Sequence, residues 1–121
     1  MLRDETIRRV VQFRDDRDWL QYHTPKDLAI SMCLEAAELL EVFQWSGTDL
    51  QCEGKLDKIR EELADVLSYC ILMADVCGLD LDEIMNAKVD RNEMKYPAEL
   101  ARGSAAKYTE LKKAARAAEA E

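Results

Sequence analysis

Two pairs of carboxylates with the same spacing stand out in the sequence, Glu35 with Glu38 and Glu62 with Asp65. Side chains at positions i and i+3 of a helix project from one face, with Cβ atoms about 5–6 Å apart. Gathering several ionised carboxylates is unfavourable unless a cation lies between them. The spacing therefore predicts a site for a hard divalent cation, which takes oxygen ligands and is usually completed by substrate phosphates.

Two of these acids fall within apolar helical patterns, where an unpaired charge is costly. The pattern around the first pair consists of Leu28, Met32, Glu35, Leu39 and Val42. Glu62 lies between Ile59 and Val66 in the second pattern. We therefore expect Glu35 and Glu62 to face the interior and to need a cationic partner.

Basic residues of the chain offer these acids little compensating charge. Lys26 is the only basic residue in the first of the two helices, and Lys58 and Arg60 are expected on the outer side or at the beginning of the second. A di-iron site needs Glu-x-x-His motifs on two helices, and His23 is the single histidine, so this type of site is disfavoured. A zinc site is disfavoured because it needs clustered His or Cys ligands, which the sequence lacks. Magnesium is the expected ion, with manganese as a substitute. The alternative is that the acids are solvated and form ordinary surface salt bridges.

Aromatic and polar residues elsewhere are candidates for binding an organic substrate. Trp19 and Trp45 each end a helical pattern, and stacking a base on an aromatic ring is worth about 1–3 kcal/mol. Lys88, Asn92 and Lys95 share one helix face, with Tyr96 just beyond, and could hold phosphate oxygens. The alternatives are that the tryptophans are core or interface aromatics and that the Lys-Asn-Lys face is simply solvated.

Helices must position all of these residues, because the chain has only four Gly and two Pro among 121 residues. Hydrophobic periodicity, an N-cap at Thr24-Pro25 and a C-cap at Gly78 predict an all-α fold. The expected helices cover residues 4–21, 25–45, 55–77 and 82–95, with a loop at 46–54. Residues 105–121 become rich in Ala and charge, so we expect a loose or less ordered C-terminal tail, above all at 112–121.

Composition limits the classes of partner. The net charge of -8 disfavours a nucleic-acid polymer or an anionic membrane, and no apolar run is long enough to span a bilayer. The sequence begins Met1-Leu2-Arg3-Asp4-Glu5, which is too charged for a signal peptide, so we expect a cytoplasmic protein. Four cysteines form no Cys-x-x-Cys pair, and they are expected to be reduced residues of the core.

Several segments around the acids share their residues with one known family. The segments are Phe13-Arg14, Arg17-Asp18-Trp19, Gln21-Tyr22-His23, Glu35-x-x-Glu38-Leu39, Phe43-Gln44-Trp45, Glu61-Glu62-Leu63-x-Asp65, Lys88-x-Asp90-x-Asn92, Tyr96-Pro97 and Arg102-Gly103-Ser104. In these segments the chain resembles the all-α nucleoside-triphosphate pyrophosphatases of the MazG-like superfamily, most closely the dCTP pyrophosphatase branch. Asp27 departs from the Asn that relatives often carry.

The resemblance implies one MazG-like domain over residues 1–111, with a four-helix bundle-like core. It implies Mg²⁺ on Glu35, Glu38, Glu62 and Asp65, and a base pocket that draws on Trp19, His23, Trp45 and Tyr69. It also implies that Lys88, Asn92 and Tyr96 lie near the phosphates or sugar, and that the protein is a homodimer or homotetramer whose subunits share sites.

The implied activity is magnesium-dependent hydrolysis of a nucleoside triphosphate, dCTP or a modified dCTP, to the monophosphate and pyrophosphate. Such an ion lowers the pKa of the water that attacks the α-phosphorus. Glu38 or Glu41 would orient or deprotonate this water, and the sequence does not choose between them. The alternatives are a related pyrophosphatase that acts on dUTP or phosphoribosyl-ATP, or a non-catalytic helical module whose acidic face binds a protein.

Overall fold

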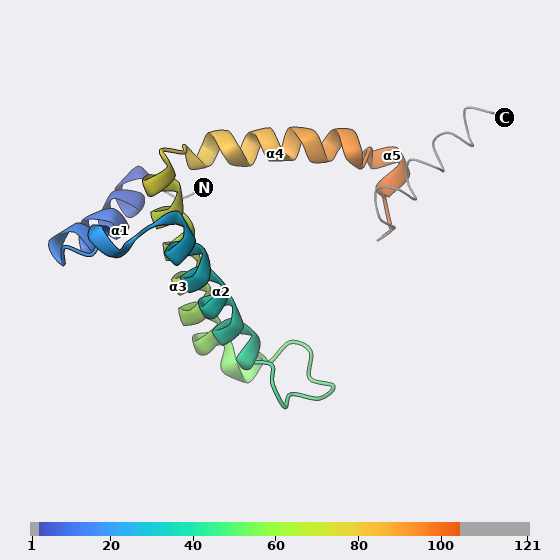
Figure 1. The fold of residues 1–121 in the computed structure, drawn as a ribbon. Coiled ribbons are helices and arrows are strands. Elements are labelled where there is room, and N and C mark those ends of the chain that lie inside the picture. The colour runs from blue at the N-terminus through green and yellow to red at the C-terminus, as the bar shows by residue number, and fades with distance from the viewer. Residues whose placement is uncertain (1–2, 105–121) are drawn as a thin grey trace. The chain divides into compact units, whose positions relative to one another are not determined.

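The computed structural model describes residues 3–104, and these contain five α-helices and no strand (Figure 1). The α-helices are α1 (Asp4–Asp16), α2 (Pro25–Glu41), α3 (Leu56–Cys77), α4 (Leu81–Lys95) and α5 (Ala98–Ala101), with short 3₁₀ helices η1 (Leu20–Tyr22) and η2 (Glu53–Lys55). The predicted all-α fold is confirmed. The tail predicted at 105–121, including 112–121, lies outside the described residues.

Helices α2 and α3 form an antiparallel pair that runs side by side in Figure 1. The Thr24 hydroxyl accepts a hydrogen bond from the backbone N–H of Asp27 at 3.1 Å, so α2 begins as predicted, with Pro25 in its first position. Helix α3 ends at Gly78, whose φ of 66° suits glycine. These caps fix the ends of the two helices that carry the acid pairs.

Helix α1 is shorter than predicted, because it ends at Asp16 rather than near residue 21. The carbonyl of Arg14 accepts hydrogen bonds from the amides of both Arg17 and Trp19, and Asp18 has a φ of 53°. A residue in the left-handed region stops helix propagation, and Asp tolerates that region better than most residues. The chain therefore turns at Asp18, and Leu20–Tyr22 forms η1 instead.

Helix α2 also ends earlier than predicted, at Glu41 rather than Trp45. The amides of Phe43 and Gln44 bond to the carbonyls three residues earlier, at 3.0 and 3.1 Å, which marks a tightened last turn. Trp45 then adopts a φ of 70°, which α-helix geometry excludes. The predicted loop follows, and its last residues form η2.

The chain divides after Asp80 into two compact units, a first with α1 to α3 and a second with α4 and α5. Among the described residues, the buried apolar side chains all belong to the first unit: Leu28, Val42, Cys52, Ile71, Leu72 and Ala74. Arg14 and Glu62 are the buried charged residues of the described chain. The core of the first unit is therefore small and contains two charges that need partners.

The cysteines are only partly where the sequence predicted them. All four are free thiols, as expected, but the core position is right only for Cys52, which lies in the loop before η2. Cys33 and Cys77 are exposed, and Cys70 is half-buried. An apolar helical pattern thus overestimated their burial, because α2 and α3 also present apolar residues to solvent. No described helix is long and apolar enough to cross a membrane.

Candidate functional site

The four predicted acids form one cluster between α2 and α3. Glu35 and Glu38 come from α2, and Glu62 and Asp65 from α3. One ligand atom from each of the four lies within 4.8 Å of the other three. Antiparallel packing brings together two pairs that are far apart in the sequence, so the donor set consists of carboxylate oxygens alone. Such a set suits Mg²⁺ or Mn²⁺.

Glu62 is the most deeply buried member of this acid cluster, at 4% exposed. Lys58, one turn earlier on α3, places its Nζ 2.9 Å from Glu62 Oε1. This hydrogen bond lowers the pKa of Glu62 and outweighs burial, which acts in the opposite direction. The expectation that Lys58 offers the acids little compensating charge is therefore wrong, because its side chain reaches one turn forward along α3 to Glu62. An i, i+4 spacing of Lys and Glu was the available signal.

The remaining oxygens of the acid cluster show how well a cation fits. Glu35 Oε2 and Glu62 Oε2 are both buried and have no hydrogen-bond partner. Hydrogen bonds to Glu62 and Glu35, with their negative charge, raise the pKa of the exposed Glu38 to about 7. A cation bound here would give the two buried oxygens a positively charged partner. It would also favour loss of the proton that Glu38 retains into the neutral range. The four residues therefore fit a divalent metal.

A cavity of about 530 Å³ adjoins the acid cluster within the first unit. This volume is in the range of small-molecule sites. The residues lining the cavity are Thr6, Arg9, Val10, Phe13, Arg14, Trp19, His23, Glu35, Glu38, Asp65, Ser68, Tyr69 and Leu72. The lining thus combines three of the four acids with aromatic rings and a histidine, which is the combination that a nucleotide would require.

The cavity wall formed by the end of α1 is aromatic and held in place by cation–π contact. The rings of Phe13 and Trp19 meet edge to face, with centroids 5.8 Å apart. The Arg17 guanidinium lies 3.6 Å from the centre of the Phe13 ring and 6.0 Å from that of Trp19. This packing fixes the rings, so that Trp19 presents an ordered surface to the cavity.

His23 supplies an unpartnered polar atom to the same cavity. Its Nδ1 is buried and has no hydrogen-bond partner. Burial, with the positive charge of Arg14, lowers the pKa of His23, so the imidazole is neutral near pH 7. A neutral ring with a free nitrogen can recognise a polar edge of a bound molecule.

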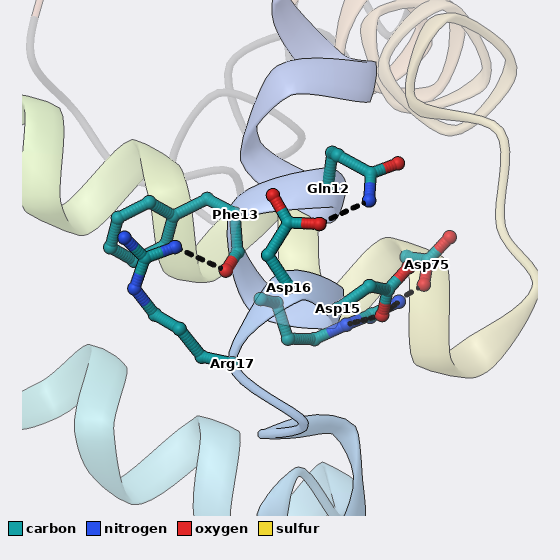
Figure 2. A network of polar contacts seen from close by, with 7 residues as sticks. Gln12, Phe13, Asp15, Asp16, Arg17 and Asp75 are labelled. Carbon is teal, nitrogen blue, oxygen red and sulfur yellow. Dashed lines mark hydrogen bonds and ion pairs between the residues drawn. The ribbon is translucent and has the colours of Figure 1, made fainter.

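An ion pair that was not predicted ties this wall to α3. Arg14 is 3% exposed, and its guanidinium contacts the carboxylates of Asp15 and Asp75. Figure 2 shows both acids at this end of α1, together with the Gln12–Asp16 bond and the Arg17 bond to the Phe13 carbonyl. The position of Arg14 in the apolar pattern of α1 could have indicated a buried acid partner, but not which one.

Two predicted site residues of the first unit, Glu41 and Trp45, lie outside the cavity lining. Glu41 lines a separate hollow with Leu40, Phe43 and others, and it is neither in the acid cluster nor on the cavity wall. The Trp45 side chain is 92% exposed and does not line the cavity. Within the second unit, Lys88 and Asn92 are exposed on α4, and the Tyr96 amide bonds to the Asn92 carbonyl at 2.8 Å.

Comparison with known proteins identifies a family that matches most of the chain. Residues 30–111 match the MazG-like family, a segment that includes both acid pairs. The chain belongs to the MazG-like family. The match begins within α2 and covers α3, α4 and α5 of this MazG-like chain, so it leaves out α1 and the turn after it, which supply the aromatic wall.

Relatives of this MazG-like protein carry names that agree with the predicted branch. It is 40% identical over 113 residues to dCTP pyrophosphatase 1 of Mus musculus and 41% identical to that of Homo sapiens, covering 88% of this chain and 66% of each relative. The chain thus spans about two thirds of their length. A crystal structure of a pyrophosphatase from Archaeoglobus fulgidus is similar with a TM-score of 0.72 and 43% identity, covering 78% of this chain and 91% of that one. The predicted family and MazG-like fold are confirmed.

Proposed function

We propose that this chain is a magnesium-dependent nucleoside-triphosphate pyrophosphohydrolase that converts dCTP, or a modified dCTP, to the monophosphate and pyrophosphate. The observation that carries the proposal is the cluster of four carboxylates beside a cavity of about 530 Å³ with aromatic and histidine lining. The names of the relatives at about 40% identity support the choice of dCTP.

In the proposed reaction, the four acids hold Mg²⁺, which would neutralise the triphosphate and make the attacking water more acidic. The water oxygen bonds to the α-phosphorus, the bond to the β-phosphate breaks, and its electron pair leaves with pyrophosphate. Glu38 accepts the water proton. Its position on the cavity wall, beside the other acids, supports this role.

Glu41 is the alternative base and serves as a matched control. It lies one turn after Glu38 on the same helix but outside the cavity lining. At saturating Mg²⁺, Glu38→Gln should lose turnover by at least about a hundredfold, whereas Glu41→Gln should retain it. Full turnover by both variants would contradict the assignment of either glutamate as the base.

The base of the nucleotide would stack on Trp19 and Tyr69, with His23 bonding to a polar edge. All three line the cavity. We further propose that the triphosphate or sugar contacts Lys88, Asn92 and Tyr96. Replacing Trp19 with Ala should raise KM for dCTP by tenfold or more, since a stacked base contributes about 1–3 kcal/mol.

We also propose that the protein assembles as a homodimer or homotetramer and that Trp45 serves the site of a neighbouring copy. The exposed apolar residues Ile30 and Leu34 lie one turn apart on α2, and Leu63 and Leu67 lie one turn apart on α3. Such stripes favour helix-to-helix contact with another copy. Sedimentation at micromolar concentration tests the assembly. Mixing Glu62→Gln subunits with Trp45→Ala subunits should restore part of the activity that each variant loses if subunits share sites.

A substrate screen tests the function as a whole. Pyrophosphate release would be measured from the common nucleoside triphosphates, modified dCTP, dUTP and phosphoribosyl-ATP, each with Mg²⁺ and with chelator. We expect metal-dependent release with the highest kcat/KM for dCTP or a modified dCTP. A preference for dUTP or phosphoribosyl-ATP would show that the proposed substrate is wrong. A lack of pyrophosphate release from every nucleotide would refute the proposed enzymatic activity.

A further inference from the structure

Lys58 is a cation that the chain itself brings to the acid cluster. Its Nζ lies 2.9 Å from Glu62 Oε1 and 3.7 Å from Glu61 Oε2. Glu62 is 4% exposed, whereas the Lys58 side chain is 57% exposed. The ammonium of a solvent-exposed side chain thus reaches the most deeply buried carboxylate of the cluster.

The contrast between the two oxygens of Glu62 shows what Lys58 does. Oε1 has the ammonium as its partner, while the buried Oε2 has none. Without Lys58, this buried carboxylate would lose the positive charge beside it, while three further acids lie close by and all four are within 4.8 Å of one another. Leaving a buried charge uncompensated is strongly destabilising.

We propose that Lys58 is a built-in counter-ion that stabilises the metal-free acid cluster and opposes metal binding. This inference rests on the proposed metal site. A divalent ion held by the four carboxylates would carry charge of the same sign as the Lys58 ammonium that binds Glu62, and like charges repel. The same charge that keeps the metal-free protein folded therefore lowers its affinity for the metal.

Arg60 offers a matched control, because it carries the same charge two residues further along α3. Its guanidinium pairs with Asp57 at 3.3 Å, and both side chains are largely exposed. Arg60→Gln therefore removes one positive charge from the helix but leaves Glu62 with its partner. Lys58→Gln removes the charge at the cluster, and Lys58→Arg keeps it.

The experiment measures Mn²⁺ binding by electron paramagnetic resonance of the free ion, and thermal unfolding in chelator and in saturating Mn²⁺. We expect Lys58→Gln to bind Mn²⁺ about tenfold more tightly than the unsubstituted protein. Lys58→Arg and Arg60→Gln should stay within about twofold. In chelator, Lys58→Gln should melt below Arg60→Gln, and saturating Mn²⁺ should close that gap. Equal or weaker Mn²⁺ binding by Lys58→Gln would overturn the proposal.

Two further outcomes separate this inference from the proposed function. If Lys58→Gln is unfolded in chelator, Mn²⁺ should restore its helical circular dichroism, and failure to refold would overturn the proposal. If the unsubstituted protein binds no Mn²⁺, the proposed metal site is refuted. The proposed effect of Lys58 on metal binding is then refuted as well. A low melting temperature of Lys58→Gln in chelator would then still establish Lys58 as the counter-ion.

Discussion

The Nη1 atom of Arg14 lies 2.6 Å from Oδ2 of Asp75, and this contact joins α1 to the end of α3. Arg14 is among the most buried residues described, and Asp15 provides a second carboxylate 2.9 Å away (Figure 2). Burial opposes the charged form of Arg14, but the hydrogen bonds that its guanidinium donates to Asp75 and Asp15 outweigh this effect and raise the pKa of Arg14. The cavity wall on α1 is therefore attached to α3 through this ion pair.

Removing the Arg14 guanidinium should destabilise the first unit. We expect Arg14→Met to lower the free energy of unfolding by roughly 3 kcal/mol, because Asp75 loses its partner and a contact between α1 and α3 is lost. Urea unfolding followed by circular dichroism measures this. Asp16→Asn is the control, since Asp16 is exposed and bonds only to Gln12 among the contacts identified. A loss below about 1 kcal/mol would show that the pair contributes little to stability.

Divalent metal should stabilise the protein against heat. At a Mg²⁺ concentration of a hundred times Kd, linkage predicts a gain of about 2.7 kcal/mol. Glu62→Gln removes the most buried ligand and should abolish most of this gain. Glu61→Gln is its matched control, because Glu61 is the exposed neighbour outside the acid cluster. Equal stabilisation of both variants would argue against a site at these four acids.

The proton held by Glu38 should make metal binding depend on pH. Hydrogen bonds and negative charge from Glu62 and Glu35 raise the pKa of Glu38 from 4.5 to about 7. Its contribution to the stability of the metal-free fold is therefore present at low pH and is lost as pH rises through about 7. A metal must displace that proton, so affinity should rise roughly tenfold per pH unit below 7 and level off above it.

Calorimetric titration of metal between pH 5.5 and 8.5 measures this dependence, and buffers of different ionisation enthalpy report the proton released. Glu38→Gln cannot hold the proton, so its affinity should be lower but nearly constant over this range. An unsubstituted protein with constant affinity across pH 7 would contradict the assigned pKa.

Substitution of Trp45 should affect both the stability of the protein and its affinity for dCTP. Its φ of 70° is unfavourable for a bulky residue, and its side chain is 92% exposed. Only glycine avoids the strain, so Trp45→Gly should be about 1 kcal/mol more stable than Trp45→Ala. Both should lose affinity for dCTP if Trp45 contacts the substrate. Thermal unfolding and KM measure the two effects, and equal stabilities would show that the backbone there is unstrained.

The acid cluster could be predicted from the sequence because two short-range rules agreed there. Spacing at i, i+3 placed Glu62 beside Asp65, and the apolar pattern placed Glu35 and Glu62 inside. The structure brings these acids within 4.8 Å of one another, since α2 and α3 pack in an antiparallel pair. Local patterns are sufficient when both partners lie on regular helices that continue beyond the site.

Features at helix ends and between helices could not be predicted in the same way. The stop of α1 depends on a left-handed Asp18, which hydrophobic periodicity does not register. The pairing of Arg14 with Asp75 joins residues 61 positions apart, so it depends on how α1 packs on α3. Lys58 is a different case, because its i, i+4 spacing from Glu62 places both residues on one helix face, so the sequence did contain a local signal for this pair.

Equal division of the four carboxylates between α2 and α3 has a topological consequence. An ion held by both helices would act as a reversible cross-link, closing a ring that includes the loop at 46–54. Unlike a disulfide, it would join only the folded chain and would be released on unfolding, and chelation would open it without any redox chemistry. The concentration of divalent ions would then determine the lifetime of the folded protein as well as its catalytic rate.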